Sequence, residues 1–278
     1  MKRIFTLLTG ICMSVMSMAQ TDTTKNTGDT IRIGSMIIVK KGGHENSEVQ
    51  ERQKTRIYRR TYKPSAVTTN WFIVDLGFTN YTDNTVYTDP SVIGAGGMVT
   101  PGMTKNDFKL RAGKSSNVNI WLFMQRLNVV KNVVNLKYGL GIETNNYRYK
   151  QSVLFQTDPV KATIDNVRHY DKNKLSADYV TVPMMLNFNF TPNRRQGFGI
   201  SVGASAGYLY SSRQKTVTDE DGKEKTHDDF NLNKWKISYV GEVQLGPVKL
   251  YGSLATKSIF ESGLDQTPYS MGIRFSSW

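Results

Sequence analysis

The feature of this sequence that most limits its possible folds is a strict alternation of side-chain character over residues 133–144. Residues of one parity are apolar and residues of the other are small or polar: Val134, Leu136, Tyr138, Leu140 and Ile142 against Asn135, Lys137, Gly139, Gly141 and Glu143. Because successive side chains of a β-strand point to opposite faces, this run predicts a strand with one apolar and one polar face. It is long enough for the ~9–11 residues that a tilted strand needs to cross a bilayer. We therefore predict an apolar face against lipid and a polar face turned inward.

Seven further segments carry the same alternation, and the links between the strands follow a pattern. The segments are 71–79, 117–126, 179–190, 197–210, 235–245, 248–256 and 269–278, and the links run long, short, long, short, long, short, intermediate. Long loops outside and tight turns in the periplasm are typical of outer-membrane barrels. A spanning sheet must close, because an open edge cannot form its hydrogen bonds in lipid. The sequence thus predicts an all-β fold, an eight-stranded antiparallel transmembrane β-barrel over residues 71–278.

Residues 1–19 predict a cleaved signal peptide that exports the chain. A positively charged start precedes a short apolar run, and small residues occupy positions 17 and 19, which a signal peptidase reads. The run is too short for a spanning helix. Cys12 is the only cysteine, and Ile11 before it disfavours the alternative of lipidation. We expect the mature chain to start at Gln20 and to reside in the cell outer membrane.

The segment between the signal peptide and the first strand, residues 20–70, is polar and disfavours a packed core. We predict a flexible, mostly disordered periplasmic arm with one apolar patch, residues 31–39, that could form a strand. The second half of the arm is strongly basic, with Arg52, Lys54, Arg56, Arg59, Arg60 and Lys63. Such a cluster suits an anionic surface or a periplasmic envelope protein, and the alternatives are an idle tether or a plug in the barrel mouth.

The whole chain carries a net charge of +13, which raises nucleic acid as a possible partner. Export of the chain argues against that partner. We expect no nucleic-acid binding and take outer-membrane lipids as the main partner.

The inward parity of the predicted strands carries charges of both signs. These residues form a predicted polar network in the barrel interior: Asp75, Asn135, Lys137, Glu143, Lys236, Glu242, Gln244 and Arg274. The interior of an eight-stranded barrel is just wide enough for side chains. Opposite charges should pair there, because an unpaired charge in a low dielectric is costly. A closed core is therefore expected. The alternative is a narrow porin-like path for small solutes, for which the wider lumen of a ten-stranded barrel would be better suited.

Aromatic residues cluster near the ends of the predicted strands. They are candidates for the interfaces between headgroups and hydrocarbon: Trp71, Tyr147, Tyr149, Tyr179, Tyr208, Tyr210, Trp235 and Trp278.

No motif predicts a catalytic, metal or cofactor site. His44, His169 and His227 lie in polar stretches outside the predicted strands and lack metal-ligand spacing. Residues 219–222 begin like a calcium loop, but the later ligands are misplaced, so a loop tip is the better interpretation. Neither GxSxG nor a phosphate-binding glycine loop occurs. A lipid-modifying barrel enzyme, the remaining alternative, would need a histidine on a strand near the rim.

Three features together resemble the small outer-membrane β-barrel proteins of Gram-negative bacteria. They are the signal peptide, the eight alternating strands and the aromatic end of the chain over residues 272–278. The strand VPMMLNF at residues 182–188, followed by a glycine-rich strand at 199–207, looks like the PorT-like or OmpA-like barrel group. The resemblance covers residues 71–278 and implies a non-enzymatic protein with a structural, adhesive or envelope-assembly role. The fold alternative, a secreted β-sandwich, would not need apolar faces on nearly every strand or alternating link lengths.

Overall fold

The computed structural model describes residues 30–33, 36–39, 65–94, 96–192, 194 and 197–276, and the chain divides into residues 1–61 and 62–278. In the first unit, β1 (Thr30–Ile33) pairs antiparallel with β2 (Met36–Val39), so the apolar patch forms a hairpin rather than one strand. The predicted signal peptide, His44, the basic residues from Arg52 to Lys63, and Trp278 lie outside the described residues.

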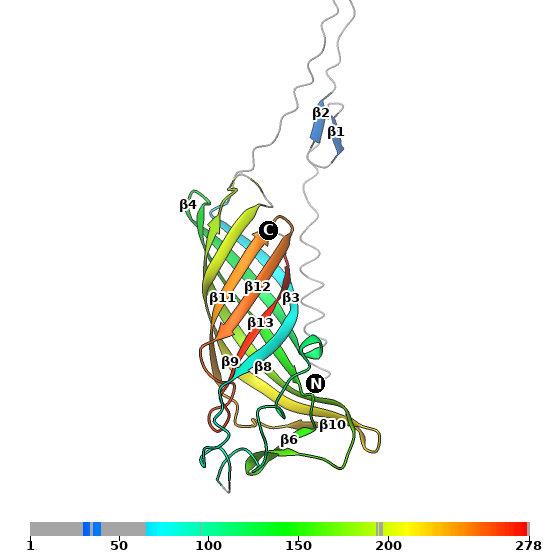
Figure 1. The fold of residues 1–278 in the computed structure, drawn as a ribbon. Helices are drawn as coiled ribbons and strands as arrows, with labels where there is room; N and C mark the ends of the chain where they lie inside the picture. The colour runs from blue at the N-terminus through cyan, green and yellow to red at the C-terminus, as the bar shows by residue number, and fades with distance from the viewer. Residues whose placement is uncertain are drawn as a thin grey trace, which may run out of the picture. The chain divides into compact units, whose positions relative to one another are not determined.

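The second unit is built on a closed ring of eight antiparallel strands (Figure 1). In ring order the strands are β3 (Val67–Asp83), β4 (Ser116–Val130), β5 (Val134–Arg148), β8 (Tyr170–Asn189), β9 (Phe198–Thr218), β11 (Trp235–Leu245), β12 (Val248–Ala255) and β13 (Gln266–Phe275). Pairing of β13 with β3 and of β8 with β9 closes the ring. The predicted eight-stranded barrel is therefore confirmed.

The long links add structure at one end of the barrel. A short 3-10 turn, η1 (Ala112–Lys114), precedes β4, and a separate hairpin pairs β6 (Val153–Thr157) with β7 (Val160–Ile164). A further strand, β10 (Gly222–His227), extends the sheet beside β9. Figure 1 shows these additions at the end opposite the short turns.

The two faces of the ring differ in the way that the alternation predicts. Leu186 and Val202 are 47% and 51% exposed on the outer surface, whereas Lys137 on the inner parity is fully buried. An exposed apolar band around a buried polar interior is the arrangement expected for a barrel whose outer wall meets lipid.

A bulge in β4 changes the parity of one strand. The pairing of β4 with β5 passes from Trp121↔Gly141 to Phe123↔Leu140, so Leu122 is an extra residue on β4. Uninterrupted alternation from Val118 and Ile120 would place Met124 on the lipid-facing side, but beyond the bulge it points inward and is 1% exposed. An extra residue in one strand inverts every later side chain.

Most of the strands reach further than the sequence indicated, for example β4 to Val130 and β5 to Arg148. β3 begins at Val67, β8 begins at Tyr170 and β9 continues to Thr218, so the outer ends of β8 and β9 lie in stretches expected to be loops. His227 ends β10, which corrects the expectation that every histidine lies outside strands; its side chain is exposed. The outer parity of these ends is polar, with Lys174 on β8 and Lys215 on β9, so the apolar outer face that marks a membrane-spanning strand is absent there.

Candidate functional site

Arg274 is buried in the barrel interior and joins two carboxylates. Its Nε and Nη2 donate to Oδ1 and Oδ2 of Asp75, each at 2.7 Å, and its Nη1 donates to Oε2 of Glu242 at 2.6 Å. The other oxygen of Glu242 accepts a hydrogen bond from Nζ of Lys137 at 2.5 Å. Strands β13, β3, β11 and β5 supply these four residues, so the ion pairs tie the wall together across the lumen. Bidentate arginine–carboxylate pairs are among the strongest charge-assisted hydrogen bonds.

Aromatic and amide groups complete the surroundings of this pair. Trp121 Nε1 and Asn119 Nδ2 donate to Oδ2 of Asp75 at 2.7 and 3.2 Å. The guanidinium carbon of Arg274 lies 5.3 Å from the ring centroid of Trp121 and 5.9 Å from that of Tyr251. The buried cation is therefore met by carboxylates at its edge and by aromatic rings nearby.

A second ion pair lies nearer the loops. Lys236 donates to Oε1 of Glu143, and its Nζ lies 5.5 Å from the ring centroid of Tyr179. Oε1 of Glu143 also accepts from Nδ2 of Asn145 at 3.0 Å. Asn117 bridges to the first group, since it donates to Asn145 Oδ1 at 2.9 Å and accepts from the Tyr251 hydroxyl at 2.5 Å. The two ion pairs thus belong to one connected set of polar contacts.

The remaining predicted interior residues lie toward the short turns. Asn135 donates to Asn187 Oδ1 at 3.1 Å, and Asn187 donates to Ser201 Oγ at 3.0 Å. Ser201 also accepts from Lys137 at 3.1 Å, which links this layer to the ion pairs. Gln244 is buried on the same inner face. The structure therefore places all eight predicted network residues inside the ring.

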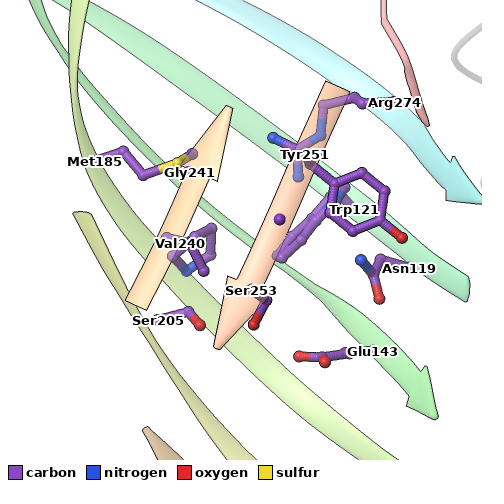
Figure 2. Close-up of a pocket in the computed structure, with 12 residues that line it drawn as sticks. Asn119, Trp121, Glu143, Met185, Ser205, Val240, Gly241, Tyr251, Ser253 and Arg274 are labelled. Atoms are coloured by element: carbon purple, nitrogen blue, oxygen red, sulfur yellow. The ribbon is translucent and has the colours of Figure 1, made fainter. Parts of the chain in front are cut away.

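Little free space remains beside the network. A cavity of about 30 Å³ lies between Trp121, Met185, Tyr251 and Arg274, which is room for about one or two water molecules. Figure 2 shows Arg274, Tyr251 and Trp121 together on one side of this cavity and Glu143 on the other. Ile73, Trp121, Met124 and Met185 form a small buried apolar group in the same layer.

The outer end of the barrel holds an apolar cluster that the sequence analysis missed, here named the cap. Its buried residues come from the loops and the outer strand ends: Val92, Met98, Val99, Met103, Phe108, Leu110, Tyr147, Tyr149, Val153, Phe155, Ala162, Leu175, Ala177, Tyr179, Phe230, Leu232, Ile259, Phe260 and Leu264. The Phe155 ring stacks on Phe260 with centroids 5.7 Å apart and meets Phe230 edge-on at 6.2 Å. The available signal was the short apolar runs inside the polar links, such as residues 153–155 and 259–260.

Hydrogen bonds join residues around the cap to Asp83, the last residue of β3. Tyr87 donates its hydroxyl to Oδ2 of Asp83 at 2.8 Å, and Gln266 donates to the same oxygen at 3.2 Å. Burial and this hydrogen bond raise the pKa of Tyr87 well above its usual value, so the phenol stays protonated at physiological pH. Lys105 donates to the backbone carbonyl of Asp83 at 2.6 Å.

Three of the predicted interface aromatics are placed elsewhere. Tyr147, Tyr149 and Tyr179 are 1–2% exposed and belong to the cap, so their assignment to the lipid interface is wrong. Tyr147 on β5 and Tyr179 on β8 have the inward-facing parity of their strands, and Tyr149 directly follows β5. At the outer ends of these strands, side chains of that parity pack against the loops. The other described candidates are exposed on the outer surface: Trp71, Tyr208, Tyr210 and Trp235.

No cluster of three or more His, Cys, Asp or Glu side chains suited to a metal ion occurs among the described residues. None of the described helices is long and apolar enough to cross a membrane.

The sequence model of a family described as outer membrane protein beta-barrel domain matches residues 74–261. That span begins in β3, covers more than half of the chain and includes the network residues from Asp75 to Gln244. A search of curated proteins found no match to the chain.

Proposed function

The chain belongs to the outer-membrane β-barrel domain family and resides in the outer membrane, and from this premise we propose that it is a non-enzymatic barrel, closed to solutes, with a structural or adhesive role. The observation that carries the proposal is the filled lumen. Asp75, Arg274, Glu242 and Lys137 connect four strands across it, and the neighbouring cavity holds about one or two waters.

The cap supports the structural or adhesive part of the proposal. Phe108, Val153 and Phe230 are fully buried within it, so the outer loops have a packed core of their own. Packed loops hold a fixed surface toward the medium, and binding residues are often carried on loops positioned by a rigid scaffold. A protein that displays such a surface needs the barrel as an anchor and does not need an open lumen.

Export and the arm complete the proposal. Residues 1–19 act as the cleaved signal peptide, and the basic residues from Arg52 to Lys63 bind an anionic surface or a periplasmic envelope protein. Deletion of residues 21–66 behind the signal peptide should leave an inserted barrel that has lost a periplasmic cross-linking partner. An unchanged cross-linking pattern at low and physiological salt would reduce the arm to a tether.

The closed lumen is tested by electrical recording in planar bilayers. The purified full chain should show negligible conductance, because paired side chains fill the interior. Steady open channels from the unmutated protein would contradict the proposal and favour a narrow solute channel instead. A heat-modifiable shift on a gel, compared before and after boiling, is the control that the protein under test is a folded barrel.

A further inference from the structure

Basic residues form an in-register row across the outer ends of four neighbouring strands. Arg148 on β5 is paired with Lys174 on β8, Lys174 with Lys215 on β9, and Lys215 with Lys225 on β10. Like charges placed directly opposite on adjacent strands repel and destabilise a sheet. A row of four such residues therefore needs a physical reason or a compensating partner.

The row faces away from the cap. Leu175 and Gln214 follow Lys174 and precede Lys215 in their strands, and both are buried toward the cap. Gln214 donates to the carbonyl of Val153 at 2.8 Å and accepts from the backbone N–H of Phe155 at 2.9 Å. Because adjacent side chains in a strand point to opposite faces, the amines of Lys174 and Lys215 lie on the outer face.

More cations flank the row on the same parity, and few anions accompany them. The flanking residues are Lys172, Arg213 and Lys223. Asp178 pairs with Arg213 at 2.5 Å, but no ion pair joins a carboxylate of the described residues to Lys172, Lys174, Lys215, Lys223 or Lys225. Nζ of Lys174 donates to the neutral amide oxygen of Asn146 at 2.5 Å. The outer face of this sheet therefore carries a strong excess of positive charge.

The charges also act on one another. Burial, together with the neighbouring cations Lys172, Arg213 and Lys215, lowers the pKa of Lys174 to about 8. Lys215 shows the same direction, since burial and the charges of Lys172, Lys223 and Lys225 lower its pKa. An anion held between these amines would remove that repulsion.

The position of the row indicates which anion is within reach. Tyr208, Tyr210 and Trp235 are exposed on the outer surface at the adjoining end of the membrane-spanning wall. Such aromatic residues mark the level of the lipid headgroups. At ~3.3 Å per residue, Arg213 lies about 10 Å and Lys215 about 17 Å along β9 from Tyr210. In Figure 1 the outer ends of β8 and β9, with β10, extend sideways beyond the barrel wall.

We propose that this row binds the phosphate groups of outer-leaflet lipids, with one phosphorylated headgroup bridging the amines of Lys174, Lys215 and Lys225. A phosphate oxygen accepts charge-assisted hydrogen bonds from several amines at once, and basic residues near an anionic lipid surface are attracted to it. The site holds lipid at the rim of the barrel on the side of β8 to β10. It does not depend on whether the lumen conducts.

Lipid retention in nanodiscs tests the proposal directly. The full chain is placed in phosphatidylcholine nanodiscs that contain a minor fraction of diphosphoryl lipid A or of the same lipid without its phosphates. Lipid that remains bound after extraction is counted by native mass spectrometry. The unmutated protein should retain the phosphorylated lipid preferentially, and the triple variant Lys174→Gln, Lys215→Gln, Lys225→Gln should lose that preference, by roughly fivefold for each lysine removed.

The matched control removes three exposed lysines from other outer loops, Lys109→Gln, Lys114→Gln and Lys257→Gln, and should keep the preference. A second measurement needs no variant: phosphorylated lipid should protect Lys215 and Lys225 of the unmutated protein from an amine-acetylating reagent. Equal retention of the two lipids, or equal loss in the two triple variants, would overturn the proposal. Protection by inorganic phosphate or by soluble polyphosphate without lipid would instead assign the row to a soluble anion and would also overturn it.

Discussion

The lumen of the barrel and the cap at its outer end are both buried, yet they are built from opposite chemistry. The lumen buries charged residues such as Asp75, Lys137 and Arg274, whereas the cap buries apolar residues such as Phe108 and Phe260. The difference follows from the surroundings of each region. Lipid accepts the apolar side chains of the wall, so the polar ones turn inward, while water around the loops drives apolar side chains together.

The two regions should therefore fail in different ways. The lumen depends on matched charge, because a buried ion that loses its partner keeps its desolvation cost. The cap depends on filled volume, because removal of a large side chain leaves a cavity that the surroundings close only in part. Substitutions that exploit this difference can separate the stability of the wall from that of the loops.

Loss of Arg274 should have the largest effect on the wall. Arg274→Ala leaves Asp75 and Glu242 without the guanidinium that they share, and we expect the free energy of unfolding to fall by roughly 3–5 kcal/mol. Urea titration of the folded barrel, followed by its heat-modifiable gel shift, measures the change. The free energy of unfolding of Arg274→Lys should lie between those of the parent and Arg274→Ala, since lysine keeps the charge and loses the bidentate geometry. An Arg274→Ala barrel as stable as the parent would refute the role given to the network.

Loss of Phe260 should have a slightly smaller effect that is confined to the cap. Phe260 is 2% exposed and stacks on Phe155, so Phe260→Ala should destabilise the packed loops by about 3 kcal/mol. Limited proteolysis should then cut the loops much faster, while the gel shift of the barrel keeps its urea midpoint. If the midpoint of the barrel fell as far as it does in Arg274→Ala, the two regions would form one cooperative unit.

A charged side chain on the lipid-facing wall should lower the free energy of unfolding of the barrel by roughly 2–4 kcal/mol near the midplane, and by less near the interfaces. Leu186 is 47% exposed on β8 and pairs with Val202, so Leu186→Arg tests this position. Leu186→Ala is the control, because lipid can fill the space of a smaller apolar side chain. Equal urea midpoints for Leu186→Arg and Leu186→Ala would show that this face does not meet lipid.

The smallest expected effect is a pH dependence of the basic row. The pKa of Lys174 is lowered from the ordinary 10.5 to about 8 by burial and neighbouring cations, so the charged form is disfavoured in the folded chain. The charged Lys174 lowers the free energy of unfolding by its full amount below pH 8, and this destabilisation fades as the pH rises from about 8 toward 10.5. In an uncharged detergent, the free energy of unfolding of the parent should therefore rise between pH 8 and 10.5, and that of Lys174→Gln should not. A gain of the same size in Lys174→Gln would assign the pH dependence to other groups.

The wall was predictable from the sequence because its two faces meet different media along the whole strand. β11 matches the predicted residues 235–245 at both ends, and its charged residues Lys236 and Glu242 lie on the inner face as their parity implies. The bulge at Leu122 was not predictable, because an extra residue leaves no mark on composition and shows itself only in the pairing.

The cap escaped the sequence analysis for a different physical reason. Its apolar residues are scattered through links that read as polar, and only the closure of the ring brings Phe155, Phe230 and Phe260 together. Tyr147 could have been placed correctly, since it shares the parity of Lys137 and Glu143 on β5. For Tyr147, the parity within β5 predicts the burial, whereas the position near the end of the strand does not.

Exchange of the Trp121 indole proton is the measurement that tests the closed lumen most directly. Nε1 of Trp121 donates to Asp75 at 2.7 Å inside the filled interior, while Trp71 and Trp235 are each 63% exposed on the outer surface. Nuclear magnetic resonance of the ¹⁵N-labelled protein in detergent reads each indole separately. A closed lumen requires slow exchange at Trp121 compared with Trp71 and Trp235, and slow exchange should persist in Phe260→Ala, where the cap is loosened. Exchange at Trp121 as fast as at Trp235 in the unmutated protein would mean a water-filled lumen and would contradict the closed barrel.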